Sequence, residues 1–171
     1  WGLLGPGKGI EWAIDALDEL VGLDPHPEYI VAGSTHPKVR ERHGEEYREM
    51  LVDRAADSTA ASHVTFDDAY RDLASLNELI QSADLVVLPY DSRDQVTSGV
   101  LVDAVAAGRP VVSTAFPHAV ELLASGAGIN FGCAGRVGVI GIVFDNSLQA
   151  RQLRAVVEAY GGRILIAGDE K

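Results

Sequence analysis

The sequence lacks the features that mark several broad classes of protein. Its only cysteine is Cys133, so one chain can form neither an intramolecular disulfide nor a cysteine-cluster metal site. The 14 lysines and arginines are outnumbered by 25 aspartates and glutamates, and the formal charge of −11 argues against nonspecific nucleic-acid or anionic-membrane partners. No apolar run approaches the roughly 20 residues of a membrane span, and nothing resembles a signal peptide. These absences favour a cytoplasmic protein.

The residues that are present predict one globular domain. A chain of 171 residues that is 47% hydrophobic is long enough to bury a sizeable core. It opens on Trp1 and not on methionine, so we expect a fragment of a longer protein. Short apolar runs alternate with helical patterns along the chain, and strands separated by helices are typical of βαβ units. We therefore predict an α/β fold with a Rossmann-like, doubly wound parallel sheet.

The expected elements follow from apolar periodicity and from glycine and proline at their ends. Ile10, Ile14, Leu17 and Val21 form one apolar stripe. Helices are expected within 9–23, 45–56, 72–83, 98–108 and 117–125, and strands within 28–33, 63–66, 84–90 and 109–114. In the third of these helices Leu73, Leu76 and Ile80 are in register. The strand "DLVVLPY" has a continuous apolar run, which predicts that both of its faces are covered.

Two loops suit ligand binding, because ligands of such sheets lie outside the carboxyl ends of the strands. The first is "GLLGPGKGI", in which Gly5, Gly7 and Gly9 allow close backbone approach and Lys8 stands before a helix. It is neither a Walker loop nor a GxGxxG fingerprint. An ordinary glycine turn is the alternative interpretation.

The second loop is "SRDQVTSGVLVDAVAAGRP", residues 92–110. A helix that begins near Ser98 presents unpaired amides and a positive dipole end, which suit a phosphate bound by an acidic protein. Gly99 removes a side chain from that approach. Gln95 and Asp103 flank this turn and suit sugar-like hydroxyls. The alternatives are that Thr97 or Ser98 is simply an N-cap and that Asp103 is a solvated helix residue.

The order of "GPGKG", "YIVAG", "VTF", "LNELIQSADLVVLPY", "TSGVLVDAVAAGRPVVST" and "HAVELL" resembles a known domain. It is similar to the nucleotide-sugar-binding C-terminal domain of the GT-B retaining glycosyltransferases that include mannosyl- and glucosyltransferases. The resemblance covers residues 1–129 and is strongest around the family's Glu-x7-Glu motif. It implies a single donor-binding domain over 1–171, with an acceptor-binding domain preceding it outside this chain.

The resemblance implies a role for each matching residue. Lys8, between Gly7 and Gly9, corresponds to the lysine that contacts the donor diphosphate. Gln95 stands at the first glutamate of the motif, which touches the donor sugar, and Asp103 stands at the second, which holds the ribose. Lys8 and Gln95 are thus the candidate catalytic residues. The segment whose backbone amides face the phosphates corresponds to Thr97, Ser98, Gly99, Val100 and Leu101.

Other positions either depart from the family or have competing interpretations. Leu3 and Leu4 replace a family arginine, and "NFGCAGRVGVIGIVFDNSLQARQLRAVVEAYGGRILIAGDEK" replaces its usual C-terminal passage. In this divergent tail, strands are expected at 136–144 and 163–168 around a helix at 147–161, either finishing the sheet or forming an altered C-terminus.

Phe66 and Tyr70 are candidates to stack on the base, with core packing as the alternative. His118 is either close to the site or, as is more usual for a lone histidine beside a proline, a loop or cap residue. Glu121 matches a family glutamate, with a structural role as the alternative. The histidines lack metal-ligand spacing.

The resemblance implies a hexosyltransferase that uses a nucleoside diphosphate-sugar such as a UDP or GDP conjugate, for example in polysaccharide biosynthesis. It implies retention of configuration and neither a cofactor nor a metal ion. Membrane contact, if there is any, would come from the missing half, and this half alone would bind donor without turnover. Two alternatives stay open: an inactive binding or interaction module, favoured by Gln95, Asp103 and the tail, and an unrelated dinucleotide enzyme, disfavoured by the absent fingerprint.

Overall fold

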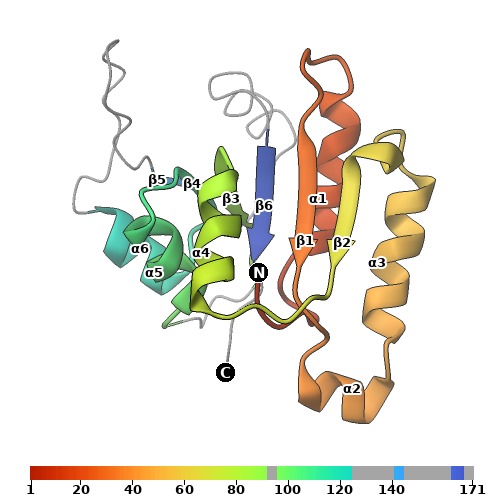
Figure 1. The fold of residues 1–171 in the computed structure, drawn as a ribbon, viewed down its shortest axis with the longest axis horizontal. Coiled ribbons are helices and arrows are strands. Elements are labelled where there is room, and N and C mark those ends of the chain that lie inside the picture. Colours follow the sequence, from red (N-terminus) through yellow and green to blue (C-terminus); the bar gives the residue numbers. More distant parts are fainter. Residues whose placement is uncertain (92–95, 125–140, 145–162, 168–171) are drawn as a thin grey trace.

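A six-stranded parallel sheet organises the part of the chain that the computed structural model describes, which is residues 1–91, 96–124, 141–144 and 163–167. The strand order is β2-β1-β6-β3-β4-β5, and each pair of neighbours is parallel. The strands are β1 (Glu28–Ala32), β2 (Val64–Asp67), β3 (Leu85–Leu88), β4 (Val111–Thr114), β5 (Gly141–Phe144) and β6 (Arg163–Ala167). Figure 1 shows helices in front of this sheet and behind it. The predicted doubly wound fold is confirmed.

The helices also match the expected segments, with one addition. They are α1 (Ile10–Leu17), α2 (Pro37–His43), α3 (Glu46–Asp57), α4 (Leu73–Ser82), α5 (Gly99–Ala106) and α6 (Pro117–Ala124), with short 3₁₀ turns η1 (Asp18–Leu20) and η2 (Ala61–His63). The sequence patterns did not predict α2, although Pro37 occupies its first turn and the ring of His36 accepts a hydrogen bond from the Lys38 amide. Its charged residues leave no buried stripe, so periodicity carries no signal.

Two expected inward residues are exposed. The chain tightens into η1 after Leu17, which turns Leu20 into the core and leaves Val21 40% exposed. Leu73 is the first residue of α4 and is 87% exposed, whereas Ile80 on the same helix is buried. In both cases the apolar period is correct over the middle of the helix and fails at its end.

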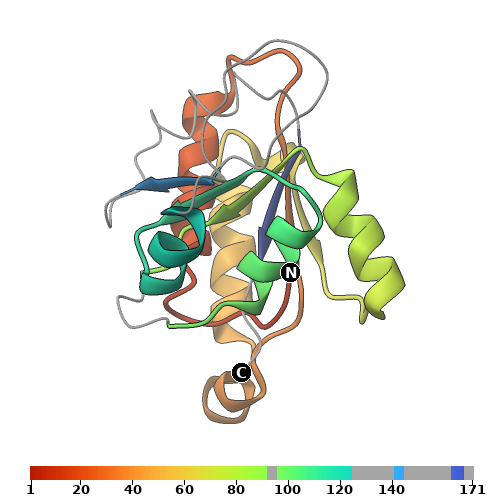
Figure 2. The same cartoon turned by 90° about the vertical axis from the view of Figure 1, so that its left-hand side faces the viewer.

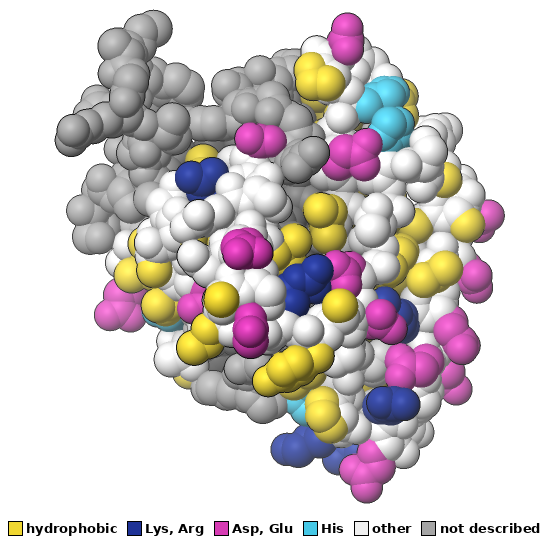
Figure 3. All heavy atoms as spheres, in the orientation of Figure 1, with side chains coloured by type: hydrophobic (Ala, Val, Ile, Leu, Met, Phe, Trp, Pro, Cys, Tyr) yellow, Lys and Arg dark blue, Asp and Glu magenta, His cyan; other side chains and the backbone are white. Residues whose placement is uncertain are grey.

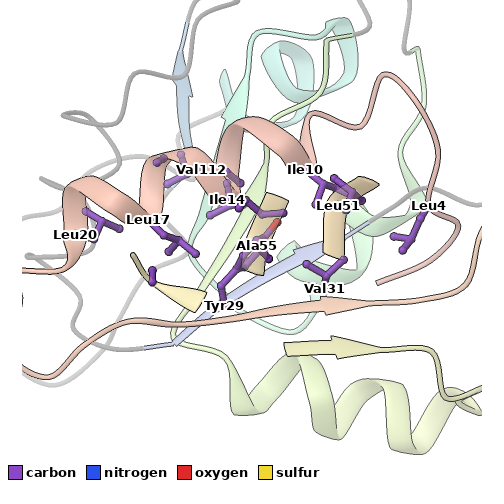
Figure 4. Packing of buried hydrophobic residues seen from close by; sticks show 14 of the residues in the cluster. Leu4, Ile10, Ile14, Leu17, Leu20, Tyr29, Val31, Leu51, Ala55 and Val112 are labelled. Atoms are coloured by element: carbon purple, nitrogen blue, oxygen red, sulfur yellow. The ribbon is translucent and has the colours of Figure 1, made fainter. Parts of the chain in front are cut away.

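Two hydrophobic clusters lie on opposite faces of the sheet. In β3, Leu85 and Val87 belong to the cluster under α1 and α3, whereas Val86 and Leu88 belong to the cluster under α4, α5 and α6. Figure 2 shows α1 and α4 on opposite sides of the sheet, and Figure 4 shows the first cluster between α1, α3 and β1. All four residues of β3 are buried, which confirms the predicted two-sided cover.

The tail adds two strands to the sheet. β5 lies at the edge beside β4, while β6 lies between β1 and β3 and pairs with both, Leu165 facing Ile30 and Val86. Both strands fall inside the ranges 136–144 and 163–168 expected from the sequence. The helix expected over 147–161 lies outside the described residues. A segment that departs from the family pattern therefore supplies a central strand.

The carboxyl ends of the strands meet at one edge, and the N-terminal loop joins them there. Leu4 forms a parallel bridge with Thr35, just beyond the end of β1, through backbone bonds to Ser34 and His36 of 2.8 Å each. In Figure 1 the N-terminus lies at the end toward which the arrowheads of β1, β2 and β6 point. This arrangement brings the glycine loop to the edge where a doubly wound sheet binds ligands.

Candidate functional site

The glycine loop is held against the residues that follow β3. The backbone carbonyl of Gly7 accepts a hydrogen bond from the Asp91 amide at 3.0 Å. Gly9 has a φ of 65°, and a Cβ atom there would lie 1.8 Å from the carbonyl oxygen of Pro89. Only glycine fits this position, because both the left-handed backbone and the close approach exclude a side chain. Gly9 is also the N-cap of α1, which begins without a side-chain cap.

Lys8 is positioned by an aromatic ring. Its Nζ lies 4.6 Å from the ring centroid of Tyr90, which is 1% exposed. That ring stacks on Phe116 with a centroid separation of 5.0 Å, and the Thr114 hydroxyl donates to the Tyr90 carbonyl at 2.6 Å. A cation over an aromatic face is attracted by the ring quadrupole. Lys8 is half-buried, and its ammonium group therefore lies over the residue that follows the end of β3 and Pro89.

The N-terminus of α5 is built by buried polar contacts. Ser98 is fully buried, and its hydroxyl accepts a hydrogen bond from the Leu101 amide at 3.2 Å. The Ser98 amide donates to Nδ1 of His118 at 2.8 Å. Ser98 is thus the N-cap, one of the two alternatives that the sequence left open. Of the amides predicted to face a phosphate, those of Ser98 and Leu101 bond within the protein, and those of Gly99 and Val100 lie between them.

Of the two positions that correspond to the glutamates of the family's motif, Gln95 and Asp103, the structure describes only Asp103. Gln95 lies outside the described residues. Asp103 is exposed, one turn into α5, and its Oδ2 accepts a hydrogen bond from the indole Nε1 of Trp1 at 3.4 Å. Thr97 is exposed before the cap. The structure therefore brings Asp103 beside the N-terminal segment, which also carries the glycine loop.

The two candidates for base stacking differ in exposure: Phe66 lies in β2, and Tyr70 lies in the loop between β2 and α4. Phe66 is half-buried, packs against the first hydrophobic cluster and has the Arg48 guanidinium 5.8 Å from its ring centroid. Tyr70 is 97% exposed. In the same segment, Arg71 donates a hydrogen bond to Asp67 at 2.5 Å, and this hydrogen bond holds the pKa of Asp67 below its usual value. Tyr70 is accordingly the ring with a face available to a ligand.

Tyr90 and His118 are the site residues whose contacts sequence reasoning did not anticipate. In the sequence, Tyr90 is the last residue of an apolar strand pattern. The sequence does not distinguish whether His118 lies close to the site or is a loop or cap residue. Both are identified by contacts between segments that are far apart in sequence, so periodicity gives no signal for them. Among the described residues, no group of three or more histidine, cysteine, aspartate or glutamate side chains is arranged to hold a metal ion.

Charge is unevenly distributed on the face drawn in Figure 3. Acidic side chains are spread over the right-hand side, where α3 lies, whereas basic side chains gather near the middle and at the lower end. The basic residues Lys38, Arg40 and Arg42 of α2 are exposed. Acidic side chains lie among these basic ones (Figure 3), and Arg40 pairs with Glu45 at 3.1 Å.

A family model and the folds of solved structures identify this chain as a glycosyltransferase domain of the GT-B type. The family model for glycosyl transferases group 1 matches residues 2–168, and the chain belongs to that family. The match includes most of the divergent tail and so extends beyond the residues that carried the resemblance. No curated protein sequence is significantly similar to the chain.

Solved structures of two proteins are among those that share the fold. Alr3699/HepE from Anabaena, crystallised with UDP-glucose, has a TM-score of 0.67 and 22% identity over 92% of this chain and 37% of its own. The same protein was also crystallised with UDP. WaaG, a glycosyltransferase involved in lipopolysaccharide biosynthesis, has a TM-score of 0.56 and 24% identity over 93% of this chain and 36% of its own. The chain thus spans little more than a third of these relatives.

No helix in the described part of the chain is both long enough and apolar enough to cross a membrane.

Proposed function

We propose that this chain is the donor-binding part of a glycosyltransferase that transfers a hexose from a nucleoside diphosphate-sugar to an acceptor such as a glycan or lipid. The observation that carries the proposal is the placement of Lys8. Its ammonium group lies over the Tyr90 ring at the carboxyl edge of a parallel sheet, in a glycine loop that admits close approach. A diphosphate is the donor group that such a cation would attract.

The second anchor of the diphosphate is the first turn of α5. The aligned peptide dipoles place partial positive charge there, and Gly99 is exposed at this turn without a side chain. Together with Lys8 this gives two positive elements in a strongly acidic chain. Binding therefore needs no metal ion in this proposal.

The sugar and the nucleoside extend from the diphosphate in opposite directions. Gln95 is proposed to contact the donor sugar, and Asp103 the ribose. Tyr70, exposed in the loop after β2, is proposed to stack on the base. UDP-glucose is the first donor to test, because Alr3699/HepE, which shares the fold, was crystallised with it.

Catalysis would consist mainly of stabilising the leaving group. The anomeric carbon loses its bond to the diphosphate oxygen, which keeps the electron pair, and gains a bond to an acceptor hydroxyl oxygen, whose proton is released. Lys8 and the α5 amides would stabilise the charge that grows on the diphosphate. The acceptor would bind in a preceding domain of the complete enzyme, so this part alone binds donor without turnover.

The direct test is calorimetric titration of the chain with UDP, GDP and their glucose and mannose conjugates. We expect saturable binding to one of these donors, equal with and without EDTA. Lys8→Ala should weaken it by roughly tenfold to a hundredfold, since a charge-assisted contact to phosphate is lost.

Lys38→Ala is the matched control, because it removes a lysine from α2, outside the glycine loop. It should leave the affinity within about twofold, and circular dichroism should show both variants folded. A folded wild-type chain that binds none of these ligands would contradict the proposal and favour an inactive module.

A further inference from the structure

His118, on α6, contacts the residue that caps α5. The residue is half-buried in the first turn of α6, and its Nδ1 accepts the hydrogen bond of the Ser98 amide, 2.8 Å away. Ser98 is fully buried and caps α5 through its hydroxyl. One imidazole therefore fixes the backbone of the residue on which the first turn of α5 depends.

This hydrogen bond fixes which ring nitrogen faces the cap of α5. Nδ1 of His118 is the atom that accepts the hydrogen bond of the Ser98 amide. If the acceptor is removed, the Ser98 amide is left without a protein partner in a buried position. An unsatisfied buried donor is destabilising, so loss of this hydrogen bond would move or fray the end of a short helix.

The same short segment also reaches Lys8. Phe116, two residues before His118, stacks on Tyr90, and the Tyr90 ring lies under the Lys8 ammonium group. Residues 116–118 therefore contact Ser98, which caps α5, and Tyr90, the ring under Lys8.

We propose that His118 is a positioning residue of the donor site, which holds the N-terminus of α5 at the separation from Lys8 that a nucleoside diphosphate bridges. This role rests on the proposed function. His118 acts through Ser98 and needs no contact of its own with the donor. The proposed role needs a hydrogen-bond acceptor at the position of Nδ1. Another side chain that places an acceptor there should therefore support donor binding as His118 does.

The test compares two substitutions at this position by calorimetric titration of the 171-residue chain with UDP-glucose. His118→Ala removes the acceptor and should weaken binding by roughly tenfold. His118→Asn places its amide oxygen near the position of Nδ1 and should restore the affinity to within about threefold of wild type. Val120→Ala, at an exposed position on the same helix, is the control and should bind like wild type.

The outcomes separate the two proposals. A folded wild-type chain that binds none of UDP, GDP and their glucose and mannose conjugates overturns the proposed function and the role of His118 with it. If wild type binds one of these other ligands and not UDP-glucose, the same variants are compared with that ligand. Binding by wild type together with equal binding by His118→Ala overturns the role of His118 alone. Equal losses in the alanine and asparagine variants, both folded by circular dichroism, also overturn it, because the acceptor atom would then not be what matters.

Discussion

The two helices that begin at the candidate site, α1 and α5, are started in different ways. α1 begins after Gly9 with no side-chain cap, and its entrance is fixed by backbone contacts with Pro89 and Asp91. α5 begins after Ser98, whose buried hydroxyl and amide bond Leu101 and His118. The first entrance depends on glycine geometry and the second on side-chain acceptors.

The difference assigns different tasks to the two loops. In the proposed site, a glycine loop that is fixed by its backbone leaves the Lys8 side chain to contact the donor. The N-terminus of α5 already carries partial positive charge from the helix dipole. Its contribution to the proposed site therefore depends on where the cap holds it and not on a charged side chain. The comparison predicts that the α1 entrance is sensitive to added atoms and the α5 entrance to lost acceptors.

The largest expected effect is at Gly9. Gly9→Ala adds a Cβ atom that would lie 1.8 Å from the Pro89 carbonyl in a left-handed backbone, so we expect the free energy of unfolding to fall by roughly 3 kcal/mol. Gly7→Ala is the matched control, because Gly7 also has a positive φ but has nothing within 4 Å of its added Cβ. It should cost about 1 kcal/mol. Urea denaturation measures both, and equal losses would contradict the close approach at Gly9.

The next effect is at the cap of α5. Ser98→Ala removes the hydroxyl that accepts the Leu101 amide, and we expect a loss of about 1 to 2 kcal/mol in the free energy of unfolding. Urea denaturation again measures the change. Val96→Ala, two residues earlier and 67% exposed, should change stability by less than about 0.5 kcal/mol. A Ser98 loss as small as the Val96 loss would show that the cap contributes nothing.

A smaller effect concerns the ring under Lys8. Tyr90→Leu removes the aromatic face, and we expect affinity for UDP-glucose to fall roughly fivefold, equivalent to about 1 kcal/mol of cation–π attraction. Tyr90→Phe retains the ring and should bind nearly as wild type. In a Lys8→Ala background the Tyr90→Leu loss should disappear, since the ring then has no cation to hold. A loss that persists there would assign Tyr90 a role apart from Lys8.

The smallest effect tests side-chain support of the α1 entrance. Trp12 is half-exposed, and its Nε1 donates to Asp91 Oδ2 at 3.2 Å. We expect Trp12→Phe to lower the free energy of unfolding by only about 0.5 kcal/mol, as measured by urea denaturation. A loss larger than that of Ser98→Ala would reverse the comparison, because side chains would then matter more at α1 than at α5.

Sequence reasoning predicted the fold because the signal for each element is local. The apolar run of β3 and the helical period of α1 are visible within a few residues, and βαβ alternation then implies a parallel sheet. It failed where neighbours change the outcome. Val21 and Leu73 fit the apolar period but lie at helix ends, where the chain turns away from the core.

For the candidate site, the sequence by itself determined the chemical groups: a lysine among glycines, and a serine before a helix that begins with Gly99. Lys8 and Ser98 are where the pattern placed them. Only the tertiary structure decided what fixes these groups. Tyr90 lies under Lys8, His118 accepts the Ser98 amide, and β6 lies between β1 and β3, because the order of strands in a sheet sets which distant segments meet. Such contacts join residues far apart in the chain, where no local pattern records them.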